Sequence, residues 1–408
     1  GRGVRDRHVR ARLHRRRPHL RPLAHGEALS ARARTASYAS TVVITLLAAG
    51  ACTGGGPIEA DLIVSAERVF DGRELIADGA VAIRDARIVA VGERSELDVD
   101  ARRSIALGDA TLMPGLVDLH VHALGEGQRY SAVTTVRDVG APETALALFR
   151  QQPGAPRVVF AGPLLTVPGG YPIPVHGEAV AGVVRDVAEA RAVVRRLAQL
   201  GVGVIKVSLE PGGQDWPTLS KAQLEAIVDG AHARDLPVTA HVSATGPARM
   251  ALEAEVDELA HMPCFGADPK LMRDLVDAEV EIVGTLHVVS GSRCPVLEYA
   301  RAFVEAGGTL LYGSDYGNPG IPPGADVEEL RLMVRAGLTP LEALTNATAR
   351  AGEQLGIDDV GTLRAGAPAD LVAVDGDVFD DLESLEVPRL VIVRGQFVVE
   401  NGTLRTPG

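Results

Sequence analysis

Six residues of types that hold metal ions follow one another along this chain, each within or just after a short apolar run. They are His120, His122, Lys206, His241, His261 and Asp315. Successive side chains of a β-strand point to opposite faces, so His120 and His122 are expected to face the same side of one strand. Imidazole and carboxylate groups are ligands that zinc and similar divalent ions prefer. The set therefore predicts a hydrolytic site with two divalent metal ions.

Each of these residues taken alone has an ordinary alternative. A single histidine at a strand end is more often a hydrogen-bonded core residue than a ligand, and a lysine there can extend its amine to solvent. Lysines occur only at positions 206, 221 and 270, so Lys206 inside the run GVGVIKVS is not a generic surface charge. Because a buried ammonium is costly, burial favours a neutral amine at this position. The complete ordered set favours the metal site over these alternatives.

The spacing of the six residues predicts the elements that position them. Lys206 follows His122 by 84 residues, His241 follows Lys206 by 35, and Asp315 follows His261 by 54. With about 30 residues for each strand and helix, these residues fall on strands 1, 4, 5, 6 and 8 of an eight-stranded α/β barrel. Helical patterns over 183–201 and 220–235 fill the gaps before strands 4 and 5. Such barrels carry catalytic groups at the carboxyl ends of their strands.

The motifs around these residues resemble those of the amidohydrolase superfamily, in the imidazolonepropionase-like branch that includes metal-dependent dipeptidases. The matching stretches run from about residue 60 to about residue 402 and include MPGLVDLHVH, VTAHVSATG, YGSDYG and VGTLRAGAPADLVAVD. The resemblance implies a (β/α)8 TIM barrel beside a small β-sandwich built from both ends of the chain. We accordingly expect a leader over 1–56, the sandwich over 57–113 and 363–408, and the barrel over 114–362.

The resemblance also implies a role for each residue of the set. His120, His122 and Asp315 would bind one metal ion, and His241 and His261 the other. Lys206, carboxylated by carbon dioxide to a carbamate, would bridge the two ions together with a hydroxide nucleophile. Zinc is the expected metal, and Asp315 is the expected general base.

The expected activity is hydrolysis of an amide or cyclic amide, of dipeptide or N-acyl amino acid type. Lactone or phosphotriester hydrolysis on the same site is the alternative. A deaminase is disfavoured because Lys206 is present and because His241 is followed by VSATG, without the acidic residue of such enzymes. A lipid-anchored binding protein that has lost turnover is a further alternative, although no ligand of the set is missing.

Other residues are weaker candidates. Tyr171 and His176 lie in a long Gly/Pro-rich loop, where substrate contacts are common, and His287 follows the strand-7 run. We expect His232 to be solvated and Arg137 to be a structural ion-pair partner. Trp216 could be a lid contact or could pack on the barrel rim.

The segment between His122 and the strand-2 run AVTTVRD is too short for a complete helix 1. We therefore expect one side of the barrel to be covered by another loop or by a partner subunit in a homo-oligomer.

The leader differs from the remainder of the chain. Residues 1–40 hold eleven arginines and two acids, and an apolar run then leads to Ala49-Gly50-Ala51-Cys52. This pattern is typical of an export signal ending in a lipidation site at Cys52, which predicts a lipid-anchored protein of the cell envelope, on its periplasmic face. The alternatives are secretion without an anchor, or a cytoplasmic chain in which the apolar run is not a signal.

Charge and cysteine content limit the partners. The net formal charge of the chain is −12 even with the basic leader included, which argues against nucleic acid and favours a small-molecule substrate. Cys264 and Cys294 follow Cys52. We expect both to be free buried thiols, and the alternative is that they pair in an oxidising compartment.

Overall fold

The structure is a computed structural model, and it describes residues 56–122, 131–145, 154–212, 215–266, 268–357 and 359–405. The leader with Cys52 and the segment 123–130, where helix 1 was expected to be missing, lie outside the described residues. Those two predictions stay predictions. Among the described residues, no helix combines the length and apolar character needed to cross a membrane.

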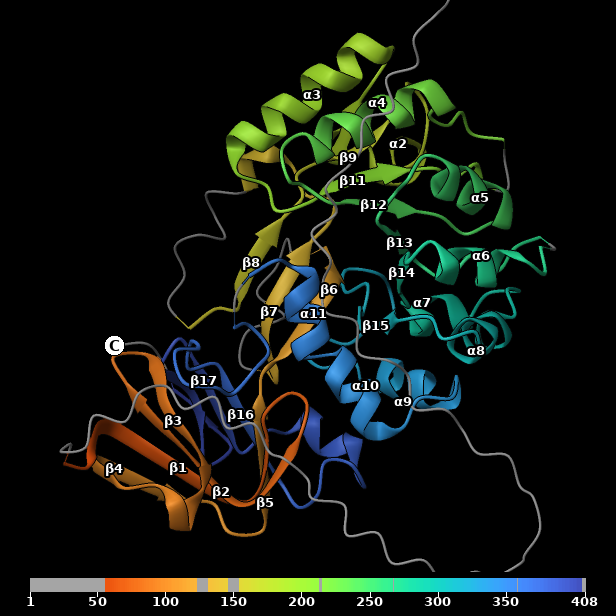
Figure 1. The fold of residues 1–408 in the computed structure, drawn as a ribbon. Helices are drawn as coiled ribbons and strands as arrows, with labels where there is room; N and C mark the ends of the chain where they lie inside the picture. Colours follow the sequence, from red (N-terminus) through yellow and green to blue (C-terminus); the bar gives the residue numbers. More distant parts are fainter. Residues whose placement is uncertain are drawn as a thin grey trace, which may run out of the picture. The chain divides into compact units, whose positions relative to one another are not determined.

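Both ends of the described chain contribute to a nine-stranded sheet. Its order is β19-β18-β17-β16-β5-β1-β2-β3, with β4 paired to β1. The strands are β1 (Ile58–Phe70), β2 (Leu75–Arg84), β3 (Arg87–Glu93), β4 (Val99–Ala106), β5 (Ala110–Pro114), β16 (Leu371–Asp375), β17 (Leu390–Val393), β18 (Gln396–Glu400) and β19 (Thr403–Leu404). β16 joins the two halves because it pairs antiparallel with β5, and Figure 1 shows the blue and orange strands side by side.

The sheet has its own apolar core. Ile83 of β2 and Ile88 of β3 belong to the same buried cluster as Leu371 of β16 and Ile392 of β17. The cluster also includes Val64 of β1 and Leu112 of β5, which lie between these strands in the sheet order, so one continuous apolar core runs along the sheet. The strands predicted from both ends of the chain are confirmed.

The middle of the chain alternates strands and helices. Parallel pairing gives one sheet of order β6-β7-β8 and a second of order β10-β9-β11-β12-β13-β14-β15. The strands are β6 (Leu116–Val121), β7 (Val133–Asp138), β8 (Arg157–Phe160), β9 (Leu164–Thr166), β10 (Ala181–Val183), β11 (Ile205–Ser208), β12 (Val238–His241), β13 (Glu258–Ala260), β14 (Glu281–Val283) and β15 (Leu310–Leu311). Every residue of β6 and β7 is buried, as expected for strands that are covered on both faces.

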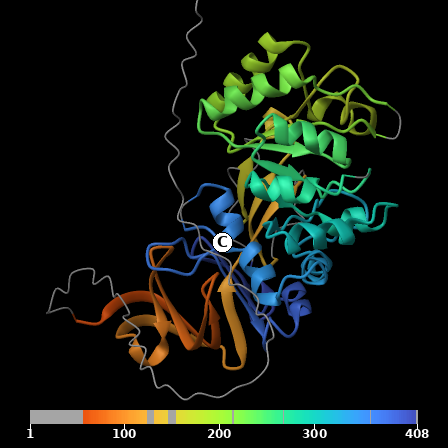
Figure 2. The same ribbon diagram turned by 45° about the vertical axis from the view of Figure 1, so that its right-hand side comes forward.

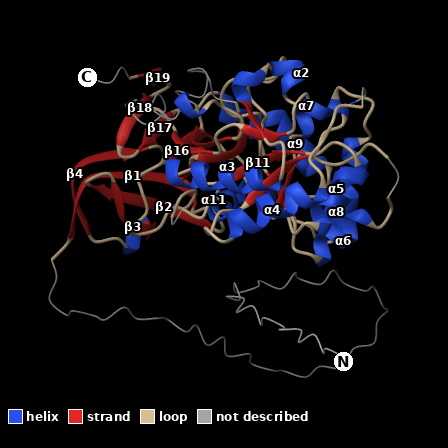
Figure 3. Cartoon of the chain, turned by 90° about the horizontal axis from the view of Figure 1, so that it is seen from above, coloured by secondary structure: helices blue, strands red, loops and turns tan. Residues whose placement is uncertain are grey.

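Helices accompany these strands, as Figures 2 and 3 show. They are α2 (Ile173–His176), α3 (Val187–Leu200), α4 (Lys221–His232), α5 (Thr245–Glu253), α6 (Leu271–Asp277), α7 (Leu286–Ser290), α8 (Val296–Glu305), α9 (Val327–Arg335), α10 (Pro340–Asn346) and α11 (Ala349–Gln354). Short 3-10 helices cover Arg94–Glu96, Glu143–Ala145, Glu178–Val180 and Leu382–Glu386. In Figure 3 the helices gather around β6–β15, whereas the nine-stranded sheet is nearly free of them.

Local sequence signals fix the ends of the two predicted helices. The Asp186 carboxylate accepts the first free amides of α3, and Gly201 ends that helix in the left-handed conformation. Ser220 and Gln223 form a capping box at the start of α4. The helices predicted over 183–201 and 220–235 are therefore confirmed, and the described fold is mixed α/β.

Backbone hydrogen bonds also connect the two parallel sheets. The amide of Leu119 in β6 donates to the carbonyl of Tyr312 just beyond β15 (3.2 Å), and the amide of His122 donates to the carbonyl of Tyr316 (2.7 Å). On the other side, the amide of Gly203 before β11 donates to the carbonyl of Phe160 at the end of β8 (3.0 Å). These bonds bring the first and last strands of the series together, and with them their polar residues.

Candidate metal centre

His120, His122 and Asp315 form one compact group. The Asp315 Oδ1 atom lies 3.4 Å from His120 Nε2 and 3.3 Å from His122 Nε2. One ligand atom from each of the three residues lies within 4.8 Å of the others. The amide of Asp315 donates to the carbonyl of His120 (2.7 Å), so the backbone itself holds the two segments together. This geometry suits the binding of one divalent ion by two imidazoles and one carboxylate.

A buried carboxylate and a glycine support this group. Asp118 accepts the amide of His120 (3.1 Å), the amide of Ser314 (3.0 Å) and the Ser314 hydroxyl (2.5 Å). A Cβ atom at Gly313 would lie 2.3 Å from Val283 Cγ1 and 2.9 Å from His120 Cβ. Only glycine therefore permits the strand before Asp315 to approach β6 so closely.

His241 and His261 form a second group beside the first. His241 Nδ1 lies 2.9 Å from His261 Nε2, and the ring centroids are 4.3 Å apart. The Nδ1 atom of His261 lies 2.7 Å from the Thr285 hydroxyl oxygen. If His261 donates to Thr285 from Nδ1, its Nε2 lone pair points toward His241 Nδ1. Two nitrogens from neighbouring strand ends thus face one point.

The two groups meet at Asp315. The Oδ2 atom of Asp315 is 3.9 Å from His261 Nδ1, and the rings of His120 and His261 are 4.6 Å apart. Three residues here have positive φ angles without being glycine: His261 (90°), Thr285 (44°) and Asp315 (59°). Such conformations cost free energy and concentrate where side chains must be aimed at a functional site.

Burial favours the neutral form of three of the histidines and of Lys206. It is the largest cause that lowers the pKa of His120, His241 and His261 well below the usual 6.5, and neighbouring positive groups act in the same direction. Burial also lowers the pKa of Lys206 to about 7; Asp315 opposes this effect, and Arg137 adds to it. Neutral imidazoles offer lone pairs to a metal, and a neutral amine can react with carbon dioxide.

Several buried polar atoms at the site have no hydrogen-bond partner among the described residues: His120 Nδ1, Lys206 Nζ and Asp315 Oδ1. Unpaired buried polar atoms are costly, and they are common where a ligand normally completes the site. Together with the nitrogen and carboxylate donors, these atoms fit divalent metal ions.

Tyr171 lies against the second histidine group. Its ring stacks on His241 at 4.6 Å between centroids, and Trp216 stacks at 6.0 Å from Tyr171. The Tyr171 hydroxyl lies 3.3 Å from Nε2 of His176, which is exposed. Burial, with Asp315 and Glu210 nearby, raises the pKa of Tyr171, so its hydroxyl keeps its proton. The structure thus brings Tyr171 and His176 to the histidine cluster, and Trp216 packs on Tyr171.

His287 and His232 have other partners. His287 Nδ1 lies 2.8 Å from Asp326, and its amide donates to Glu329 (2.7 Å). His232 Nε2 lies 2.9 Å from Asp257, and the side chain is 33% exposed. The prediction that His232 is simply solvated was wrong. The end of α4 places its ring against Asp257, which directly precedes β13.

Arg137 is a structural ion-pair partner, as predicted. Its guanidinium donates to both carboxylate oxygens of Glu258 (3.0 and 2.5 Å) and to the carbonyl of Leu119 (2.7 Å). Both Arg137 and Glu258 are buried. The partner, Glu258, is the first residue of β13, so the pair joins β7 to β13.

The prediction of two free thiols was wrong. Cys264 and Cys294 form a disulfide with their Cα atoms 5.6 Å apart. Cys264 lies on the segment after β13 and Cys294 precedes α8, and folding brings these segments together across 30 residues of chain.

Sequence reasoning missed Glu210, Ser243 and Thr285. Glu210 and Thr285 lie beside His241 and His261, and Ser243 donates to Glu210, so these residues do not extend the ligand pattern. The one available signal was position, since Glu210 and Ser243 follow Lys206 and His241 by four and two residues at strand ends.

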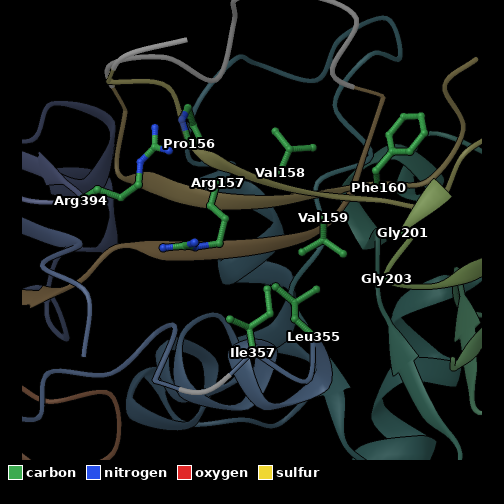
Figure 4. Close-up of a pocket in the computed structure, with 10 residues that line it drawn as sticks. All are labelled: Pro156, Arg157, Val158, Val159, Phe160, Gly201, Gly203, Leu355, Ile357 and Arg394. Atoms are coloured by element: carbon green, nitrogen blue, oxygen red, sulfur yellow. The ribbon is translucent and has the colours of Figure 1, made fainter. Parts of the chain in front are cut away.

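A cavity of about 350 Å³ lies elsewhere, at the amino-terminal ends of β8 and β11. Figure 4 shows its ten lining residues, which include Arg157, Arg394, Leu355 and Ile357 but no histidine or carboxylate. Arg157 is engaged with Asp370 at 3.6 Å. The cavity has no part in the candidate metal centre.

Comparisons with known proteins show the family and the fold of this chain. A family model described as "Amidohydrolase family" matches residues 129–398. Imidazolonepropionase from Ralstonia nicotianae is 28% identical over 365 residues, covering 74% of this chain and 87% of that protein. Ochratoxinase from Aspergillus niger is 25% identical over 397 residues, covering 78% and 82%. A crystal structure of a Xaa-Pro dipeptidase aligns with a TM-score of 0.69 at 23% identity, covering 82% and 99%, which shows a shared fold.

Proposed function

This chain belongs to the amidohydrolase family and is an enzyme that acts on amide carbon–nitrogen bonds. We propose that it uses two divalent metal ions to hydrolyse an amide or cyclic amide bond, of dipeptide or N-acyl amino acid type. The carrying observation is the convergence of two ligand groups on Asp315: His120 Nε2 lies 3.4 Å from its Oδ1 and His261 Nδ1 lies 3.9 Å from its Oδ2. The buried, unpaired amine of Lys206 supports a bridging position between the groups.

His120, His122 and Asp315 would hold one ion, and His241 and His261 the other. Neutral imidazole and carboxylate donors favour zinc. When bound, the two ions would lower the pKa of a water molecule and polarise the scissile carbonyl. The other steps of the reaction would be carried out by side chains of the protein itself.

Lys206 would react with carbon dioxide through its neutral amine. The new nitrogen–carbon bond forms a carbamate, and one proton leaves to solvent. The carbamate provides two oxygens where the structure now has an unpaired buried nitrogen. Its negative charge also offsets the positive charge of two divalent ions.

Asp315 would act as general base. Its Oδ1 atom lies beside the Nε2 atoms of His120 and His122 and would bind the ion, which leaves Oδ2 as the oxygen that would take a proton. It would take the proton of the attacking water and return it to the leaving nitrogen. Tyr171, whose hydroxyl stays protonated, and His176 would donate hydrogen bonds to substrate.

The family and its solved structures imply a TIM-barrel fold. We propose that β6–β15 close into an eight-stranded barrel, supported by the bonds of Leu119 and His122 to the segment after β15. The shared core of Ile83 and Leu371 supports a β-sandwich for the nine-stranded sheet. The boundaries 57–113, 114–362 and 363–408 follow from this division.

We further propose export and lipid anchoring at Cys52. The Cys264–Cys294 disulfide supports an oxidising compartment, since such bonds persist there. Metabolic labelling with an alkyne fatty acid should mark the wild-type protein and not Cys52→Ala. Equal labelling of both would exclude Cys52 as the site.

The substrate class is supported by the relatives, named for a dipeptidase, an imidazolonepropionase and an ochratoxinase. The test is metal content by mass spectrometry on purified full-length protein and Asp315→Asn, with both assayed on dipeptides and N-acyl amino acids. We expect about two zinc ions per wild-type chain and loss of turnover in the variant. Preferred turnover of lactones or phosphotriesters would favour the alternative hydrolase. One metal ion, or activity indifferent to Asp315, would overturn the proposal.

A further inference from the structure

Glu210 is a buried carboxylate beside the candidate metal centre that has no place among the six proposed ligands. It lies just beyond β11, four residues after Lys206, and is 9% exposed. Its Oε1 atom accepts the amide of Gly212 (2.7 Å), and its Oε2 atom accepts the hydroxyl of Ser243. These bonds fix the carboxylate in one orientation between the loops after β11 and β12.

The carboxylate faces the outer nitrogen of His241. Glu210 Oε2 lies 4.0 Å from His241 Nε2, whereas His241 Nδ1 faces His261 Nε2 at 2.9 Å. The two nitrogens of this ring thus meet different partners on opposite sides. Tyr171 stacks on the ring face at 4.6 Å and limits its rotation. A separation of 4.0 Å is longer than a direct hydrogen bond. The Glu210 carboxylate would therefore act on the His241 ring through the electrostatic attraction between its charge and an N–H at Nε2.

We propose that Glu210 is a positioning residue that favours the His241 tautomer with its proton on Nε2 and so directs the Nδ1 lone pair toward His261. A neutral imidazole carries one proton, and a negative charge near Nε2 stabilises an N–H there and disfavours a lone pair there. This inference rests on the proposed function, because the Nδ1 lone pair would serve the second metal ion. Carboxylates behind metal-bound histidines commonly contribute 10- to 100-fold in metal affinity.

Two other roles predict different results. If Glu210 only fixes the loops, removing its partner Ser243 should have the same effect as removing its charge. If it binds the ammonium group of a substrate, its loss should raise KM for amines and leave metal binding unchanged.

The first test uses zinc alone as the probe. Wild type, Glu210→Gln and Ser243→Ala are titrated with zinc in competition with a chromophoric chelator, and their melting temperatures are compared with and without zinc. We expect Glu210→Gln to bind the weaker of two zinc ions about 10- to 100-fold less tightly, with the tighter ion and the metal-free melting temperature unchanged. Ser243→Ala should resemble wild type, and Glu210→Asp should retain more affinity than Glu210→Gln.

The second test reads the tautomer directly and needs no metal. Histidine-selective 15N labelling of metal-free protein distinguishes a protonated from an unprotonated ring nitrogen, and His241→Asn assigns the signal. In the metal-free wild type we expect the His241 proton on Nε2, with His261 Nε2 donating to His241 Nδ1 and the Thr285 hydroxyl donating to His261 Nδ1. In Glu210→Gln we expect the His241 proton to shift toward Nδ1. An unchanged tautomer would overturn the inference, as would equal loss of zinc affinity in Ser243→Ala. A wild type that binds one zinc ion would instead contradict the two-metal function, and the tautomer result would still decide the role of Glu210.

Discussion

The Nδ1 atom of His241 lies 2.9 Å from the Nε2 atom of His261, although the two residues are on successive strands with a helix between them. At this distance one neutral ring can donate its N–H to the other, and a bound cation would take the place of that proton. Burial lowers the pKa of both rings, which disfavours the imidazolium form. The pair therefore offers nitrogen donors that fit a cation, and the surrounding residues can be tested for their contribution to such a site.

Replacing Lys206 by alanine should abolish metal pairing. Lys206 is buried with an unpaired amine, and its removal takes away the proposed bridge between two ions. We expect metal content to fall from about two ions per chain to one or fewer, with loss of turnover. Lys221→Ala is the control because Lys221 pairs with Glu253 at the surface. A Lys206→Ala enzyme that is active with two ions would contradict the bridging role.

Breaking the Arg137–Glu258 pair should strongly destabilise the fold. Arg137→Met leaves the Glu258 carboxylate buried without its bidentate partner, which costs about 3–5 kcal/mol. Arg185→Met, which breaks a surface pair with Glu189, should cost less than about 1 kcal/mol. Urea unfolding of both variants measures the difference. Similar midpoints for the two would show that the buried pair is not coupled to stability.

Glu329 should make the fold less stable as pH rises. Burial raises its pKa well above the usual 4.5, and the neighbouring Asp326 and Asp118 act in the same direction. The folded chain therefore keeps a proton that the unfolded chain loses. Its stabilising contribution is complete below about pH 4.5 and is lost as pH rises through the folded-state pKa.

Melting temperatures of wild type and Glu329→Gln, measured from pH 5 to pH 9, test this sign. The melting temperature of the variant should fall less steeply as pH rises than that of wild type. At the alkaline end of the range the variant should have the higher melting temperature. Glu328→Gln is the matched control, since Glu328 is a neighbouring surface residue. Parallel curves for wild type and Glu329→Gln would refute the assignment.

Loss of the disulfide should lower stability without changing the metal site. Closing a loop of 30 residues stabilises a fold by about 3.6 kcal/mol, chiefly by restricting the unfolded chain. Cys294→Ser, or reduction of wild type, should lower the unfolding midpoint accordingly and leave zinc content unchanged. The double replacement of Cys264 and Cys294 by serine should resemble the single one. Two free thiols in unfolded, unreduced protein would disprove the bond.

The sequence predicted those parts of the fold that depend on local pattern. Apolar runs ending in His120, Lys206 and His241 are buried strands because their composition allows burial on both faces. Helix limits at Gly201 and Ser220 followed from capping chemistry. The pairing of β16 with β5, which joins the two ends of the described chain in one sheet, could not be read in this way, since it depends on how distant segments pack.

The sequence by itself determined which residue types stand at the strand ends and in what order, because a strand repeats every two residues and each ligand follows its own apolar run. Only the tertiary structure decided which atoms meet: the His287 ring with Asp326, the Glu210 carboxylate with Ser243, and Cys264 with Cys294. These partners are 30 or more residues apart, and their contact is set by the packing of strands and loops against one another. Periodicity along one segment carries no information about that packing.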